Sequence, residues 1–426
     1  MMNSINREPS AKSIYVWNII GSGCNALLSV ALLMLVTRMN DDAQADIFSL
    51  GWSISQLMAT IATFQIRTYQ ATDIKKRFSF AQYLEFRIIT ILVMLISSYI
   101  YIISRGYTGK KAVIILVLCL YRAFDSLSDV YEGDFQQKER LDLAGKALTY
   151  RIVIGSIAFG SSLYISRNLL ASCVILMIAY GISFFAYNVR YNLCIEKIKE
   201  KIVFDANIKW IIQLTMEGAP LFINAFLMNA IMNAPKMYID SAISDGMIKA
   251  GSQTIFNILF MPASVLNLVY IVFRPMLTKM AIAWEEKKKN NFLKILFKIL
   301  GGLLGMTFFV IIGCWILGIP ILTLIYGIDL HVYRLHLLLI VIGGCLYTFA
   351  AVFDNALVVL RKQHILAVSY VITWIYVKVV VKILIEQWYM LGAAMAYLTS
   401  MILFITITVV MFIYFYKKEN KIVKKK

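Results

Sequence analysis

The sequence predicts an all-α polytopic membrane protein with about twelve transmembrane helices, because apolar runs long enough to cross a bilayer recur along it. Hydrophobic residues make up 60% of the 426 positions and charged residues 15%. In soluble domains, apolar residues make up roughly 45–50% and charged residues about 25%. The mean hydropathy is +0.74. Backbone amides in lipid must be bonded within their own segment, and the runs lack the alternation of a membrane β-barrel, so we expect helices.

The apolar runs divide evenly between the two halves of the chain. Those of the first half cover residues 14–37, 47–66, 85–104, 112–131, 143–165 and 169–189, and those of the second half cover residues 208–233, 249–273, 292–318, 335–360, 365–385 and 389–416. We therefore expect a six-helix lobe at 1–189, a basic cytoplasmic linker at 190–207, and a second six-helix lobe with a lysine-rich tail at 208–426.

The formal net charge of +18 would suggest a nucleic-acid partner in a soluble protein. Lys and Arg residues instead fall in the gaps between apolar runs, which are alternately rich and poor in them. This pattern is typical of the charge bias that orients membrane helices. We therefore expect no nucleic-acid partner, contact with membrane lipids, and both termini on the cytoplasmic side of a bacterial inner membrane.

Motifs of soluble enzymes are missing from the sequence. It contains no P-loop, no GxSxG, no dinucleotide fingerprint, no HExxH and no Cys/His cluster, so we expect no catalytic site, cofactor or metal. Transport driven by ATP within this chain is excluded on the same ground. Any pumping must use an ion gradient or the membrane potential.

The two halves resemble a weak internal repeat. Gly21 in the first half has a counterpart in Gly218, and residues 45–67 have a counterpart in 250–274. Repeats in the same orientation imply an axis along the membrane normal, with a substrate site between the halves. The alternative is chance similarity between apolar helices.

Arg67 and Arg274 occupy matching positions at the cytoplasmic ends of the second helix of each half. The planar fork of arginine suits phosphate oxygens, so two arginines from opposite lobes are suited to clamp a diphosphate. The competing interpretation is ordinary anchoring by positive charge on the cytoplasmic side.

Ionisable residues inside the predicted spans are further candidates, because their burial is costly. Arg122, Asp125 and Asp129 share one face of the fourth helix. Either Arg122 and Asp125 form an internal salt bridge, or the face lines a wet cavity that binds an anion through Arg122 or exchanges a cation through the carboxylates. Arg151 of the fifth helix either pairs with this face or lines the cavity.

Two more carboxylates belong to the second half. Glu217 precedes Gly218 and Pro220 near the start of the seventh helix, where a turn broken by proline would form a hinge, a cation site or a simple kink at the membrane entry. Asp354 is a single carboxylate near the inner end of the tenth helix.

Four stretches resemble the polysaccharide-transporter branch of the MOP (multidrug, oligosaccharidyl-lipid, polysaccharide) flippase superfamily, the Wzx-type flippases of O-antigen and capsule repeat units. They are WNIIGSGCNALLSVALLMLVTRM at 17–39, IFSLGWSISQLMATIATFQIRTYQATD at 47–73, YRAFDSLSDVYEGDFQQKERLDLAGKALTYR ending at Arg151, and EGAPLFINAFLMNAIMNAPKMYID at 217–240.

This resemblance implies a V of two six-helix lobes around a cationic cavity that alternates between the membrane faces. The implied cargo is an undecaprenyl-pyrophosphate-linked oligosaccharide, with the arginines on its pyrophosphate. Coupling to H⁺ or Na⁺ would give Asp125, Asp129, Glu217 and Asp354 a role. The implied partners are the polysaccharide polymerase and chain-length machinery.

Three alternatives remain beside this expectation. A multidrug and toxin extrusion (MATE) antiporter has the same fold, but it exports organic cations, which an excess of arginines disfavours. A membrane polymerase or ligase acting on lipid-linked sugars typically needs a long outer loop, and the gap at 234–248 is short. The third is a lipid II flippase. Such flippases typically carry two further C-terminal helices, whereas we expect a lysine-rich tail after the twelfth run, so this identification is disfavoured.

Overall fold

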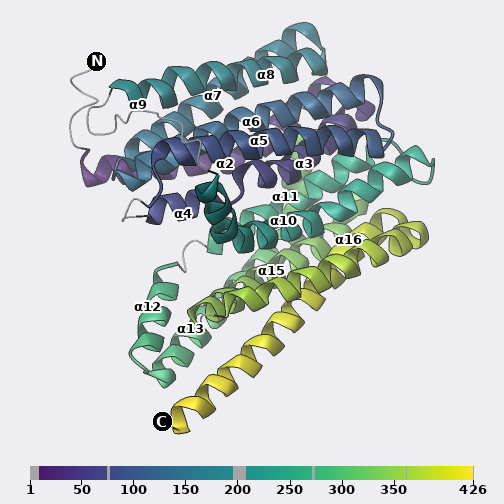
Figure 1. Cartoon of the computed structure of the whole chain (residues 1–426). Helices are drawn as coiled ribbons and strands as arrows, with labels where there is room; N and C mark the ends of the chain where they lie inside the picture. Colours follow the sequence, from purple (N-terminus) through teal and green to yellow (C-terminus); the bar gives the residue numbers. More distant parts are fainter. Residues whose placement is uncertain (1–8, 74–76, 195–207, 271–273, 361, 426) are drawn as a thin grey trace. The chain divides into compact units, whose positions relative to one another are not determined.

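The computed structural model describes residues 9–73, 77–194, 208–270, 274–360 and 362–425, and within these ranges the chain forms helices and no strand (Figure 1). Its internal contacts divide it into two compact units, Met1–Asn229 and Ala230–Lys426. Helix α10 contains residues of both units. Most of the expected linker, residues 195–207, lies outside the description, so the lobe boundaries at 189 and 208 stay predictions.

Unit 1 consists of the helices up to the first part of α10. They are α2 (Ala11–Met39), α3 (Asp42–Thr63), α4 (Ile66–Thr72), α5 (Phe80–Ser104), α6 (Gly109–Gln137), α7 (Leu141–Ser166), α8 (Leu169–Ser183), a π-helical turn at Phe184–Val189, α9 (Arg190–Cys194) and α10 (Lys209–Ser244).

Unit 2 continues with the remainder of α10 and the following helices. They are α11 (Ser252–Tyr270), α12 (Arg274–Glu285), α13 (Lys289–Gly313), a π-helical turn at Cys314–Gly318, α14 (Ile319–Tyr326), a 3₁₀ turn at His331–Tyr333, α15 (Arg334–Val359) and α16 (Gln363–Lys425). Tyr389 interrupts α16 with φ of 52° and ψ of −126°, so α16 is two helices joined at a kink.

Eight helical segments among the described residues are long and apolar enough to cross a membrane, which confirms the predicted polytopic class. Among the described residues, each expected apolar run lies mainly on a helix, although the run 47–66 extends past the end of α3. Helices α3, α6 and α11 match expected runs but are not among the eight, and α16 is counted once despite its kink. The number of about twelve spans therefore stays a prediction.

Helix α6 is the central helix of unit 1. It packs against α3, α4, α5, α7 and α8, as the bundle in Figure 1 shows. Because α6 is surrounded by other helices, its polar face is turned toward protein rather than lipid. This position explains why the helix with the most charges of this unit is buried within it.

Helices α2 and α7 approach closely through glycine. A Cβ at Gly145 would lie 2.5 Å from the carbonyl oxygen of Trp17, and one at Gly21 would lie 3.1 Å from the carbonyl oxygen of Gly145. Small residues permit such backbone contact between membrane helices, where dispersion contacts replace the hydrophobic effect. The pair therefore sets the separation of α2 and α7.

We expect Gly145→Val to push α2 away from α7 and to lower stability by about 1–3 kcal/mol, the usual cost of overpacking. The thermal unfolding midpoint of the detergent-solubilised protein measures this loss. Gly23→Ala is the matched control, because a Cβ at Gly23 meets nothing within 4 Å. Equal midpoints for Gly145→Val and the unmodified protein would show that the contact does not set the helix separation.

Candidate functional site

Helix α3 ends at a sharp break. Phe64 and Gln65 adopt left-handed conformations with φ of 45° and 54°, whereas a continuous helix would pair the Ala62 carbonyl with the amide four residues on. This carbonyl accepts hydrogen bonds from Arg87 Nη1 and Thr90 Oγ1 of α5, both at 2.7 Å. Because an unpaired carbonyl is costly within a membrane, the two donors stabilise the break.

The break directs α4 against α6. The buried side chain of Gln70 donates a hydrogen bond from Nε2 to the carbonyl of Val130 at 3.1 Å. Arg67 lies three residues before Gln70, on the same face of α4. The contact of Gln70 therefore places the guanidinium of Arg67 beside the acidic residues of α6.

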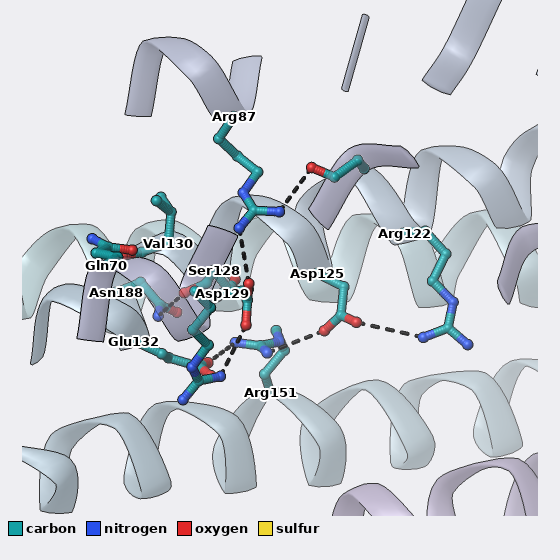
Figure 2. Close-up of polar contacts among 12 residues, drawn as sticks. Gln70, Arg87, Arg122, Asp125, Ser128, Asp129, Val130, Glu132, Arg151 and Asn188 are labelled. Atoms are coloured by element: carbon teal, nitrogen blue, oxygen red, sulfur yellow. Dashed lines mark hydrogen bonds and ion pairs between the residues drawn. The ribbon is translucent and has the colours of Figure 1, made fainter. Parts of the chain in front are cut away.

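Seven charged side chains of unit 1 form one group, which we call the arginine–carboxylate cluster (Figure 2). Its members are Arg67 of α4, Arg87 of α5, Arg151 of α7, and Arg122, Asp125, Asp129 and Glu132 of α6. The carboxylates are spaced by four and then three residues, so they share one face of α6.

Each carboxylate of the cluster lies between two arginines. The two oxygens of Asp129 accept from Arg67 Nη1 and Arg87 Nη2, each at 2.9 Å. Glu132 lies 3.3 Å from Arg67 Nη1 and 2.7 Å from Arg151 Nη1. Such double pairing compensates the removal of each carboxylate from water.

Asp125 continues the same arrangement toward the other end of α6. It lies 3.1 Å from Arg151 Nη2 and 3.4 Å from Arg122 Nη1 (Figure 2). The guanidinium of Arg122 also lies over the rings of Trp52 and Tyr121, 4.6 and 5.0 Å from their centroids. The negative faces of these rings stabilise the terminal cation.

Charges therefore alternate along the cluster from Arg122 to Arg87, and four guanidinium groups face three carboxylates. Both ends of this row are arginines, Arg122 and Arg87, so the cluster as a whole carries one excess positive charge.

Solvent reaches the cluster at two places, at Asp125, whose side chain is 30% exposed, and at Arg67 with Asp129. The side chain of Arg67 is 33% exposed and that of Asp129 22%, whereas that of Arg87 is 1% exposed. Within the described part of the chain, both ion pairs of Arg67 use Nη1. An anion that enters the cluster would therefore meet the fork of Arg67 first.

The structure brings together most of the charged residues that the sequence predicts for the first half. Arg67, Arg122, Arg151, Asp125 and Asp129 all belong to the cluster. The predicted pairing of Arg122 with Asp125 and of Arg151 with the acidic face is present. Whether these residues also take part in function stays a prediction.

Sequence reasoning missed Arg87 and Glu132, although both had a signal. Arg87 lies inside the apolar run 85–104, where any ionisable residue is a candidate. Glu132 follows Asp129 by three residues and Asp125 by seven, so it continues the same helical face just beyond the predicted end of the span.

Arg274 is the first residue of α12 in unit 2. Its side chain lies outside the described residues. The predicted clamp between Arg67 and Arg274 therefore stays a prediction.

The helix is not interrupted at the proline near Glu217, and whether this turn acts as a hinge, a cation site or a kink stays a prediction. Helix α10 begins at Lys209 and continues without interruption past Pro220. Glu217 instead lies 3.7 Å from Arg77 Nη1, and it accepts a hydrogen bond from Gln213 at 3.3 Å. Because the helix starts well before the proline, the missing amide of Pro220 falls inside α10 rather than in its first turn.

The same part of α10 contacts the α3–α4 break. A Cβ at Gly218 would lie 2.9 Å from the side chain of Ile66 and 3.1 Å from that of Phe64. One turn further on, the ring of Phe222 stacks on that of Phe64, with a centroid distance of 4.4 Å and an interplanar angle of 9°. Gly218 therefore permits a close contact that a larger residue would prevent.

Asp354 of α15 is a buried carboxylate in unit 2, 9% exposed. Its Oδ2 accepts a hydrogen bond from the hydroxyl of Tyr370 at 2.7 Å, and its Oδ1 has no partner among the described residues. Across those residues, no group of three or more His, Cys, Asp and Glu side chains is placed to hold a metal ion. The predicted role of Asp354 in ion coupling stays a prediction.

No protein-family model matches the chain. The sequence is similar to the capsular polysaccharide biosynthesis protein CapF of Staphylococcus aureus, with 23% identity over 425 residues, which cover 95% of this chain and 98% of the relative.

Three solved structures share the fold at low sequence identity. The lipid II flippase MurJ in an inward closed conformation matches with a TM-score of 0.66 and 14% identity, over 94% of this chain and 86% of that one. The MATE transporter VcmN of Vibrio cholerae matches with a TM-score of 0.63 and 13% identity, over 98% of each chain. An inward-facing multidrug resistance MATE transporter of the MOP superfamily matches with a TM-score of 0.64 and 12% identity, over 94% of this chain and 99% of that one.

These likenesses confirm the resemblance stated from the sequence. The chain has the fold of the MOP transporters and is a multi-pass membrane protein.

We expect Arg87→Met to destabilise unit 1 by about 3–5 kcal/mol, because it leaves partly buried Asp129 with one partner and removes a donor from the Ala62 carbonyl. Arg87→Lys keeps the positive charge, so we expect it to lower the stability of unit 1 by less. Arg190→Met at an exposed position of α9 is the control. Thermal unfolding in detergent measures the three variants, and an unchanged midpoint for Arg87→Met would contradict the importance of this pair.

Proposed function

We propose that the chain is a flippase that moves an undecaprenyl-pyrophosphate-linked oligosaccharide repeat unit from the cytoplasmic to the outer leaflet. The observation that best supports this proposal is the excess positive charge of the arginine–carboxylate cluster, together with the side chain of Arg67, which is one-third exposed. The similarity to a capsular polysaccharide biosynthesis protein and the fold shared with a lipid II flippase agree with it. We place the chain in a bacterial inner membrane with both termini cytoplasmic.

The cluster suits a diphosphate for an electrostatic reason. Moving this group unaided through hydrocarbon is prohibitively costly, and fixed cations offset much of the cost. A diphosphate oxygen that binds the fork of Arg67 takes the place of Glu132, which retains its shorter pair with Arg151. The cargo therefore binds without leaving a buried carboxylate unpaired, and Arg274 would supply the second cation.

Alternating access then follows from differential affinity. A cargo shifts the equilibrium between inward-open and outward-open states only by as much as it binds one state better than the other. An ion gradient or the membrane potential would set the direction of transport. A MATE antiporter remains the alternative with the same fold, but a cavity for organic cations should carry excess carboxylates, whereas this cluster carries excess arginine.

We expect Arg67→Ala and Arg274→Ala each to reduce export of the surface polysaccharide by about tenfold or more, since each removes a charged hydrogen-bond donor to the diphosphate. Polymer is measured on intact cells, and lipid-linked repeat units are measured on the cytoplasmic leaflet, where they should accumulate. Arg190→Ala is the matched control for an exposed cytoplasmic arginine. Normal polymer in both variants, with normal protein amounts, would refute the diphosphate clamp.

For energy coupling we expect Asp354→Asn to abolish the response of transport to an imposed proton gradient and to weaken that to a sodium gradient, because the neutral amide cannot exchange a proton and attracts a cation less strongly than a carboxylate. Transport of the lipid-linked cargo is measured in proteoliposomes with and without each gradient. Glu386→Gln is the control, since its carboxylate is 47% exposed. If Asp354→Asn keeps the full gradient response, coupling must be assigned to Asp125, Asp129 or Glu217.

A further inference from the structure

Lys236 is a buried lysine near the end of α10 that the charge pattern places at the outer face. Its side chain belongs to unit 2 and the residue is only 9% exposed. The ammonium group lies over the ring of Phe260 of α11, 4.3 Å from the centroid. Among the described residues, no carboxylate lies within ion-pair distance of it.

A lone buried ammonium is unfavourable unless something compensates its charge. The cation–π contact with Phe260 is weaker than a charged hydrogen bond to an anion, so it offsets only part of the cost of desolvation. Intramembrane cations without a counter-ion are typical of binding sites rather than of packing. Lys236 therefore lacks an anionic partner that the described protein does not supply.

Gln253 on the facing helix is a second buried polar group with unused hydrogen-bonding capacity. It is 0% exposed, and both its Oε1 and its Nε2 lack a hydrogen-bond partner among the described residues. Most buried amides in proteins are satisfied, so an amide with two orphaned atoms requires an explanation. An absent ligand with both donors and acceptors would provide it.

Phe260 links the two groups through α11. Gln253 precedes Phe260 by seven residues, so both lie on one face of α11, separated by about 10 Å along the helix axis. Asn257 lies between them on that face. Lys236 of α10 contacts the Phe260 end of this polar strip, where the ring of Phe260 also packs on that of Tyr397 of α16, with a centroid distance of 4.8 Å. The length of the strip is comparable with one or two sugar rings.

We propose that Lys236 and Gln253 form a binding site for an acidic sugar of the translocated repeat unit, with Lys236 on its carboxylate and Gln253 on its hydroxyl groups. This inference rests on the proposed flippase function and specifies its cargo as an anionic glycan. One lysine matches one carboxylate in charge, whereas a diphosphate carries more charge than Lys236 alone balances. The amide donates and accepts, as sugar hydroxyls require.

Another source of an anionic group is a phospholipid headgroup. Headgroups lie at the membrane surface, where exposed Lys249 is available to them, whereas Lys236 and Gln253 are both buried. The sugar of the cargo is therefore the favoured source. The site is closed in this conformation, so an acidic sugar should favour a state in which α10 and α11 separate.

The test uses the full chain in nanodiscs of neutral phosphatidylcholine, titrated with glucuronate or with glucose at constant ionic strength. We expect glucuronate, and not glucose, to raise the thermal unfolding midpoint. Lys236→Gln should weaken the apparent affinity for glucuronate about tenfold or more. The same variant should unfold at a higher temperature without ligand, because it removes an uncompensated buried charge, and a purely structural lysine would show the opposite.

Three controls make the outcome decisive. Lys236→Arg should retain the glucuronate response and Lys249→Gln should behave like the unmodified protein, while Gln253→Leu should weaken binding. A stabilisation that depends on Lys236 and appears only in phosphatidylglycerol nanodiscs would assign the site to lipid and overturn the proposal. Absence of any Lys236-dependent response to glucuronate would overturn it as well.

Polysaccharide export separates this inference from the proposed function. We expect Lys236→Gln to reduce surface polymer in the native host and Lys236→Arg to restore it. If Lys236→Gln exports polymer normally while Arg67→Ala does not, the chain is still a flippase but the acidic-sugar site is wrong. If Arg67→Ala and Arg274→Ala both export normally, the proposed function itself fails, whatever Lys236 does.

Discussion

The pairing of buried charge on α6 is the constraint on which the rest of unit 1 depends. Three carboxylates in the middle of a membrane bundle are tolerable only because arginines arrive from α4, α5 and α7 to contact them. The helices that supply these arginines are thereby fixed around α6. Because arginines occupy both ends of this row of charges, the bundle keeps one positive charge that no carboxylate of the cluster balances.

Much of the fold followed from the sequence because lipid imposes a simple rule on it. Apolar length and the need to bond every backbone amide predict helices and their approximate limits. The partners of Arg67 were not predictable in the same way, since Asp129 and Glu132 are more than sixty residues away in the chain. Only packing brings α4 and α6 together, and no periodicity encodes it.

Local rules also failed where the tertiary context overrides them. Pro220 suggested a broken turn near Glu217, but α10 starts at Lys209 and encloses the proline. The actual break lies at Phe64 and Gln65, which are not turn residues by composition. It persists because Arg87 and Thr90 of another helix satisfy the Ala62 carbonyl, a compensation invisible within the segment itself.

The stacked rings of Phe64 and Phe222 give α10 a mechanical role. The first part of α10 passes the α3–α4 break at Gly218 and Phe222. The break that places Arg67 beside α6 is therefore supported from a second side by uncharged side chains. A larger residue at Gly218 would press on Ile66, the residue directly before Arg67, so the size of a neutral residue bears on the position of a charged one.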